Sequence, residues 1–251
     1  FIWRALLSRT GHKNPAGEDF TFVSLMRQIS NRSYRPVSNR FPALAIGFAA
    51  LGAFMQPTAA QAATSDDELW IETGIKGDIA PGTDFKLELE TRRREGPNEY
   101  ILGAEVNTDV SSALALGGGI EIHDEDGFTE VRPYQQLTFG LGKFDFRSRI
   151  EERFYDGADR MALRLRQRAR FRTKVADKIT GFASGELLYQ LRDRNEGGPQ
   201  RIDQWRLNAG ATARIAPELE LTGGYLFQIR PRDNGNTRHT HVSQVSLFYR
   251  F

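Results

Sequence analysis

The amino-acid sequence predicts an all-β protein: an antiparallel, up-and-down transmembrane β-barrel of about 10–12 strands that follows a cleaved signal peptide. Three observations predict this fold class. Polar and apolar residues alternate in run after run, short and long connections alternate between the runs, and an export signal precedes a chain that ends on an aromatic residue. Alternation at every second residue is the period of a β-strand, because successive side chains point to opposite faces.

The N-terminal region has the three parts of a secretory signal peptide. Four arginines within residues 27–40 precede an apolar stretch from Phe41 to Met55, and small residues ending in Ala60-Gln61-Ala62 follow it. Cleavage is therefore expected after Ala62. The alternative, a membrane-spanning helix, needs about 20 apolar residues, and this stretch is shorter.

The first methionine, Met26, stands just before the basic region, which suggests a domain organisation in three parts. Residues 1–25 are expected to be an upstream, non-native extension, residues 26–62 the signal peptide and residues 63–251 the barrel. Removing the seven basic and two acidic residues of 1–62 from the chain's 34 and 32 leaves 27 and 30, a net charge of −3. A slightly acidic exported chain does not favour nucleic-acid binding, which depends on neutralising phosphates.

The alternation after Ala63 divides the chain into eleven runs, each with one apolar and one polar face. In the second run, Phe85, Leu87 and Leu89 face one way, whereas Glu88 and Glu90 face the other. The expected strands are 68–79, 84–92, 99–106, 113–123, 128–140, 143–154, 160–174, 179–191, 201–215, 218–230 and 240–251. Single-chain bacterial barrels have an even number of strands, so eleven is not expected to be the final count. Either the first run is not a full strand, which gives ten strands, or one run contains two strands, which gives twelve.

The connections also alternate in length. Short ones are expected at 80–83, 107–112, 141–142, 176–178 and 216–217, and longer polar ones at 93–98, 124–127, 156–159, 192–200 and 231–239. Tight turns at one end and longer loops at the other are typical of bacterial outer-membrane barrels. Aromatic residues near both ends of the runs, such as Tyr100 and Trp205 near the loops and Phe144 near the turns, suggest the girdles of such barrels.

The last run, "HVSQVSLFYRF", places Tyr249 and Phe251 on one face and ends the chain on phenylalanine. A terminal aromatic residue after an alternating strand resembles the signal by which outer-membrane proteins reach their assembly machinery. Tyr249 and Phe251 are therefore the candidate assembly signal.

Four segments resemble a bacterial family catalogued as domain of unknown function 2490. They are "ELWIETGIKGDIAPGTDFKLELETRRR" (68–94), "RLRQRARFR" (164–172), "DQWRLNAGATARIAPELELTGGYLF" (203–227) and the last run. The resemblance covers essentially the whole of 63–251 and implies a barrel in the outer membrane of a Gram-negative bacterium. It brings no catalytic residues with it. The partners expected are outer-membrane lipid and, during biogenesis, the barrel assembly machinery, and the protein is expected to be a monomer.

The segment "LRLRQRARFR" carries an arginine at every second position. On a strand these five guanidinium groups share one face, and this face must be the lumen, because a charge facing lipid at the bilayer midplane costs about 2–4 kcal/mol. Carboxylates on neighbouring runs are expected to pair with them, since the planar guanidinium holds a carboxylate through two hydrogen bonds. The lumen-facing charged residues predicted are Glu88, Glu90, Glu130, Arg132, Arg147, Arg149, Glu151, Arg153, Arg164, Arg166, Arg168, Arg170, Arg172 and Glu186.

These charges support two interpretations. Because the interiors of small barrels are usually filled, a paired Arg/Glu network that plugs the lumen is the main expectation, with a structural or envelope-associated role. The alternative is a narrow, porin-like conduit that prefers anions. A soluble lipocalin-like barrel would need an apolar interior, which the arginine run argues against.

An outer-membrane lipid-modifying enzyme is a further alternative, and it would use histidines. His239 and His241 stand two apart near Ser243, a spacing that places both rings on one strand face and suits a metal ion or a Ser–His pair. His123 precedes "DEDG" (124–127), which lacks the full ligand set of a calcium loop and is expected to be a hairpin turn. No nucleophile motif accompanies the histidines, which as loop residues are expected to be solvated. No catalytic residue, metal site or cofactor is predicted.

Overall fold

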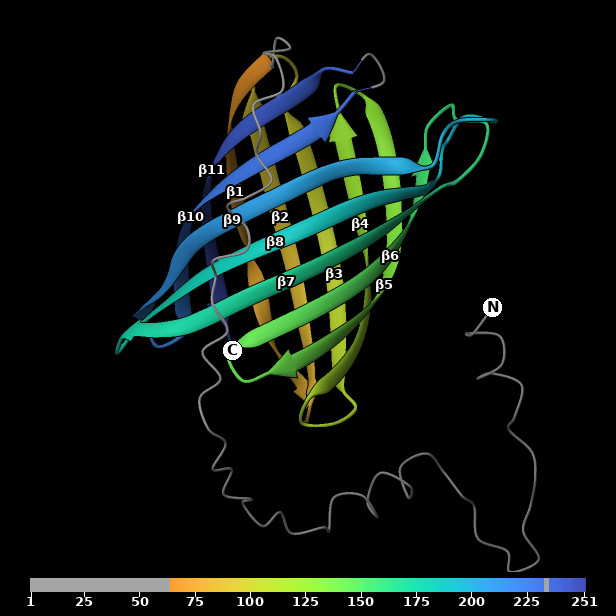
Figure 1. Cartoon of the computed structure of the whole chain (residues 1–251). Helices are drawn as coiled ribbons and strands as arrows, with labels where there is room; N and C mark the ends of the chain where they lie inside the picture. Colours follow the sequence, from red (N-terminus) through yellow and green to blue (C-terminus); the bar gives the residue numbers. More distant parts are fainter. Residues whose placement is uncertain (1–63, 233–234) are drawn as a thin grey trace, which may run out of the picture. The chain divides into compact units, whose positions relative to one another are not determined.

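The computed structural model describes residues 64–232 and 235–251, and the regular elements of this part of the chain are all β-strands. The expected upstream extension, the signal peptide and its cleavage position after Ala62 lie outside the described residues. Eleven strands form one closed barrel (Figure 1). They are β1 (Thr64–Ala80), β2 (Thr83–Arg94), β3 (Glu99–Asp109), β4 (Leu114–Glu125), β5 (Phe128–Leu141), β6 (Phe144–Tyr155), β7 (Ala162–Ala176), β8 (Ile179–Arg192), β9 (Arg201–Ala216), β10 (Leu219–Pro231) and β11 (Thr237–Arg250).

The barrel closes through a parallel pair of strands. Every strand is antiparallel to its neighbour in the sequence, but β1 runs parallel to β11, with Thr64 opposite Arg238 and Lys76 opposite Arg250. The eleven strands correspond to the eleven runs and lie within the expected range of about 10–12. Only the choice of an even number, ten or twelve, was wrong, and the antiparallel arrangement holds for every pair except this one. An up-and-down chain with an odd number of strands starts and ends in the same direction, so only a parallel pair can close it.

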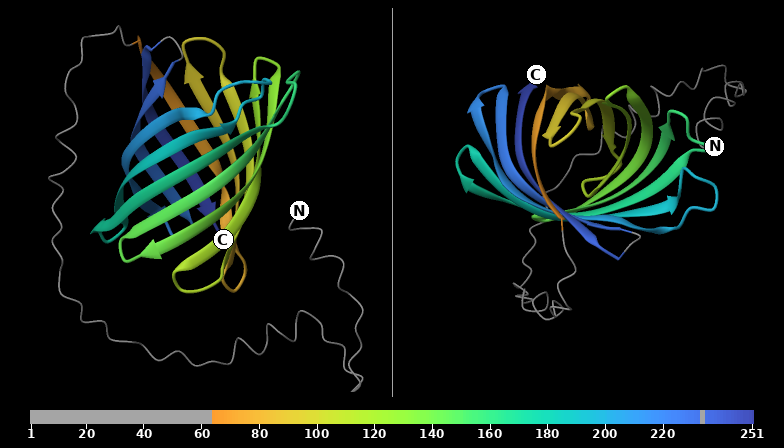
Figure 2. Two further views of the ribbon diagram at one scale, coloured as in Figure 1. Left: turned by 45° about the vertical axis from the view of Figure 1, so that its right-hand side comes forward. Right: turned by 90° about the horizontal axis from the view of Figure 1, so that it is seen from above.

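The two ends of the barrel differ in their connections less regularly than expected. The longest connection, 193–200 between β8 and β9, lies at the loop end, as predicted (Figure 2). However, β4 and β5 at the same end are joined by only two residues, Asp126 and Gly127, with φ of 52° and 78°. Positive φ at both central residues is the geometry of a type I′ hairpin turn, which agrees with the turn predicted for "DEDG".

The outer surface of the barrel is apolar along most strands. Large side chains such as Leu89, Leu102 and Leu207 are 48%, 58% and 54% exposed. A surface of this kind is unfavourable in water and matches the hydrocarbon of a bilayer, so the fold is a transmembrane β-barrel. Within the described part of the chain, no helix is long and apolar enough to cross a membrane.

Exposed aromatic residues lie near both ends of the outer surface. Tyr100, Phe154 and Trp205 are exposed near the loop end, and Phe144 and Tyr249 near the turn end. Amphipathic rings at these heights fit the two interfaces of a membrane.

Candidate functional site: the charged lumen

The strand period places the charged residues inside the barrel. On β7 the five arginines from Arg164 to Arg172 occupy the lumen face, and the apolar residues between them face outward. Arg164 is buried, whereas the side chain of Arg172, at the turn end, is 57% exposed. The arginine series therefore runs from the middle of the barrel to its turn-end mouth.

A layer of buried ion pairs crosses the lumen at mid-height, and Glu151 is at its centre. The Glu151 side chain is completely buried and lies 2.6 Å from Arg164 and 2.7 Å from Arg166. Arg166 also lies 2.8 Å from Glu186, which in turn accepts a hydrogen bond of 2.8 Å from Arg147. Three strands, β6, β7 and β8, are thus cross-linked by shared carboxylates.

The same layer continues onto β3, β4 and β5. Arg149 contacts Glu105 at 2.8 Å and Glu121 at 3.1 Å, and its guanidinium stacks 3.7 Å from the centre of the Tyr134 ring. Arg132 contacts the same Glu121 at 3.1 Å. Because each charge has a partner, the cost of removing it from water is offset, which is the condition for a stable buried ion.

Above this layer, Glu130 holds Arg132 and one further arginine, Arg153, at the loop end. It lies 2.9 Å from Arg132 and 2.6 Å from Arg153. Below it, Asp145 is buried and receives three arginines, with Arg168, Arg170 and Arg172 at 3.2, 3.0 and 3.2 Å. The arginines of the turn end therefore outnumber their carboxylate partners.

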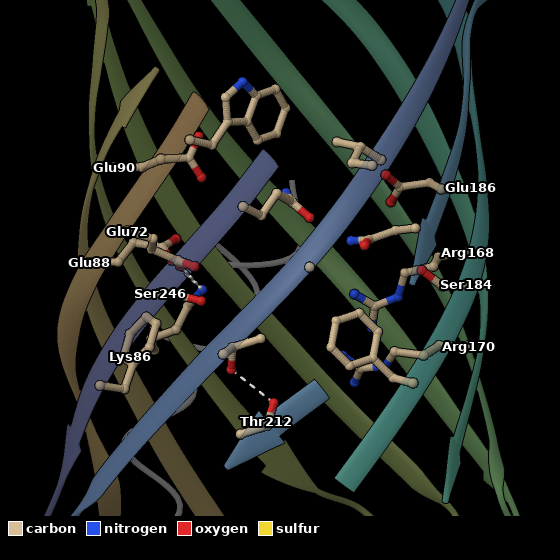
Figure 3. A pocket seen from close by; sticks show the side chains of 18 of the residues that line it. Glu72, Lys86, Glu88, Glu90, Arg168, Arg170, Ser184, Glu186, Thr212 and Ser246 are labelled. Atoms are coloured by element: carbon tan, nitrogen blue, oxygen red, sulfur yellow. Dashed lines mark hydrogen bonds and ion pairs between the residues drawn. The ribbon is translucent and has the colours of Figure 1, made fainter. Parts of the chain in front are cut away.

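An acidic wall faces these arginines across the lumen. Figure 3 shows Glu72 of β1 with Glu88 and Glu90 of β2 on one side of a cavity, and Arg168 and Arg170 on the other. Two cations neutralise part of the charge of this wall. Lys86 pairs with Glu88 and lies 3.7 Å from Glu72, and Arg92 pairs with Glu90 while stacking 3.9 Å from the centre of the Trp70 ring.

Two cavities remain inside the barrel, one on each side of the paired layer. The turn-end cavity has a volume of about 690 Å³ and the loop-end cavity about 290 Å³. Both are lined by Trp70, Arg92, Arg132 and Arg206, so the two cavities adjoin at these four side chains.

Residues 67–239 match the family described as "Protein of unknown function (DUF2490)". The chain belongs to this family. The match spans most of the barrel and confirms the resemblance found in the sequence. No curated protein matches the chain.

Two solved structures resemble the DUF2490 barrel at low identity. One is described as "KdgM porin" and the other as "KdgM porin in complex with disordered oligogalacturonate". They are 14% and 13% identical, cover 63% and 64% of this chain and 88% of their own, and give TM-scores of 0.44. At these values no function is transferred from them.

The DUF2490 barrel places the residues predicted for the lumen as follows. Thirteen of the fourteen line one of the two cavities, and the other, Glu151, is enclosed between Arg164 and Arg166. Tyr249 and Phe251 lie on the outer surface at the turn end, where Phe251 packs 5.4 Å from Phe85 and 6.3 Å from Tyr249 between ring centres.

Several lumen residues were missed from the sequence. Glu121, Asp145 and Arg206 take part in the ion pairs but were not singled out. Asp145 alternates with Arg147 and Arg149, which places it on the charged face of its run, but it was not counted among the lumen residues. Glu121 stands after three glycines, so the alternation around it is weak.

His123 was also misjudged, because it was expected to be a solvated loop residue. It is 4% exposed, lies on the lumen face of β4, and contacts Glu99 at 2.7 Å and Glu121 at 3.1 Å. The reason is that β4 continues to Glu125, two residues beyond the expected end.

His239 and His241 share one face of β11, as the strand period predicts, and that face is the outer one. Their rings pack 5.5 and 5.1 Å from the Phe227 ring, and His241 hydrogen-bonds the hydroxyl of Tyr225. Within residues 64–232 and 235–251, no hydrogen bond joins Ser243 to either histidine, and no group of three His, Asp or Glu side chains is arranged to hold a metal ion. This surface shows no Ser–His pair.

Proposed function

We propose that this DUF2490 protein is a barrel of the Gram-negative outer membrane whose lumen is closed in the resting state. Its role is then structural or envelope-associated, without enzymatic chemistry. The partners proposed for it are outer-membrane lipid along the apolar outer surface and the barrel assembly machinery at the C-terminal aromatic residues, and the barrel is proposed to act as a monomer.

The observation that carries this proposal is the buried layer around Glu151. Opening a path past Arg164 and Arg166 requires at least one buried carboxylate to lose its partners, and breaking a buried pair typically costs about 3–5 kcal/mol. Thermal energy at 25 °C is about 0.6 kcal/mol, so such an opening is rare.

Two measurements test the proposal. Cell fractionation with heat-modifiable gel mobility should place the folded barrel in the outer-membrane fraction. Liposomes that contain the purified protein should swell no faster in small sugars or small anions than empty liposomes. Recovery of the folded barrel from a soluble fraction, or rapid swelling, would contradict it.

A second candidate is a narrow conduit that prefers anions. The excess of arginine at the turn end favours it, together with the four lining residues that the two cavities share. The swelling assay distinguishes the conduit from the closed barrel. Liposomes that contain a conduit should swell faster in small anions than in neutral sugars of the same size.

A further inference from the structure

We propose that the turn-end cavity is a binding site for a small, soluble, phosphate-bearing molecule whose phosphate oxygens lie between Arg147 and Arg168. The inference goes beyond the closed lumen, because a chamber can bind a ligand from one side whether or not the barrel conducts.

The first observation is a local excess of positive charge. Twelve lysines and arginines line the turn-end cavity, but only six glutamates do. The glutamates are Glu72, Glu88, Glu90, Glu121, Glu186 and Glu220. An anion with two charges would reduce this excess.

The second observation is the arrangement of Arg147 and Arg168. They are directly opposite each other in the β6–β7 pairing, where like charges repel. Each donates one hydrogen bond to a carboxylate, Arg147 to Glu186 at 2.8 Å and Arg168 to Asp145 at 3.2 Å. The Nε atoms of both side chains are buried and have no hydrogen-bond partner.

Two neighbouring guanidiniums that each keep a donor unused are suited to one shared oxyanion. The planar fork of arginine binds phosphate oxygens through parallel N–H groups, and a phosphate monoester has three oxygens with which to accept from both forks. A buried donor without an acceptor is unfavourable, so binding would satisfy both Nε groups.

The rest of the cavity indicates the kind of molecule that carries the phosphate. Hydroxyl and amide side chains line it, among them Ser184, Thr212, Ser246 and Asn208, and its 690 Å³ exceeds what a phosphate ion needs. Groups of this kind hydrogen-bond a polyhydroxylated body. The three carboxylates of the acidic wall, Glu72, Glu88 and Glu90, disfavour an anion on their own side of the cavity and leave the β6–β7 side for it.

Calorimetric titration of the purified full-length barrel in detergent tests the proposal, with glucose 6-phosphate as the probe and glucose as its neutral analogue. Glucose 6-phosphate should bind, and glucose should bind at least ten-fold more weakly. Arg147→Gln and Arg168→Gln should each weaken the binding at least ten-fold. Arg168→Lys, which keeps the charge but loses the fork, should fall between them and the unmodified protein.

Lys174→Gln is the matched control, because it removes one positive charge from the exposed end of the same strand, where Lys174 pairs only with Asp177 among the described residues. Its affinity should be unchanged. Heat-modifiable mobility identifies the variants that are folded. The proposal is overturned if the unmodified barrel does not bind glucose 6-phosphate, or if Lys174→Gln weakens binding as much as Arg168→Gln. Neither outcome depends on whether the lumen conducts.

Discussion

Nη1 of Arg166 lies 2.7 Å from Oε1 of Glu151, a carboxylate with no exposure to water. The other oxygen of Glu151 is held by Arg164 at 2.6 Å, so this one residue of β6 fixes two arginines of β7. A carboxylate in this position cannot exchange its partners for water. The pairing is therefore the part of the lumen where a substitution should affect stability most.

Replacing Arg166 and Arg168 together with alanine should lower the free energy of unfolding by about 3–5 kcal/mol, because buried carboxylates lose charged partners. The measurement is denaturant unfolding of the barrel in lipid, followed by tryptophan fluorescence. Arg172→Ala is the control. Its side chain is 57% exposed, and Asp145 keeps Arg168 and Arg170 as partners, so the loss should be only about 0–1 kcal/mol. A double variant no less stable than Arg172→Ala would contradict the paired layer.

Gly119 gives a second test, of the packing beside that layer. A Cβ atom there would lie 2.3 Å from the backbone oxygen of Ala104 and 2.5 Å from the hydroxyl of Tyr134. Gly119→Ala should therefore destabilise the barrel, by about 1–3 kcal/mol as is typical of overpacking. Gly223→Ala is the matched control, since a Cβ atom at Gly223 would have nothing within 4 Å. Equal stability of the two variants in the same unfolding assay would count against the packing described.

The fold could be predicted because its signal is local. Each strand shows its two faces in the order of its own residues, and the charged face of β7 follows from five arginines at a period of two. The lumen positions of Glu88, Arg149 and Glu186 follow from the same rule. These predictions need no knowledge of which strands are neighbours.

The partners and the closure could not be predicted, because they depend on pairing between strands. Whether Asp145 serves Arg168, Arg170 or both is set by the register of β6 on β7. The choice of an even strand count, ten or twelve, was wrong for the same reason. The parallel pairing of β1 with β11 leaves no mark within either strand, so the even number typical of bacterial barrels was expected instead.

The parallel closure makes a prediction about topology. It places Ser65 at the loop end and Asp177, in the β7–β8 turn, at the opposite end. The chain has no cysteine, so single-cysteine variants can be labelled without background. In intact cells a membrane-impermeant maleimide should label Ser65→Cys and the loop control Gly197→Cys, but not Asp177→Cys. Labelling of Asp177→Cys without Ser65→Cys would mean that the barrel is oriented or closed differently.

The C-terminal aromatic residue makes a prediction about biogenesis. The side chain of Phe251 is 63% exposed, and its ring packs beside the rings of Phe85 and Tyr249 at the turn end of the barrel. It therefore adds little buried apolar surface to the fold. Deleting Phe251 should lower the amount of protein in the outer membrane and raise the amount in the periplasm, as measured by fractionation. Tyr100→Ala, which removes an exposed aromatic residue near the loop end, should leave the levels unchanged. If both variants reach the outer membrane at the level of the unmodified protein, Phe251 is not an assembly signal.

Conductance across a planar lipid bilayer tests the closed lumen most directly. The unmodified barrel should show no steady conductance, because the proposed closure places the ion-paired layer around Glu151 across the lumen. The Arg166→Ala, Arg168→Ala variant should stay near zero or show only irregular openings from a loosened layer. Steady, anion-selective conductance from the unmodified protein, with the selectivity lost in the double variant, would contradict the closed lumen and establish the arginines as the lining of an open path.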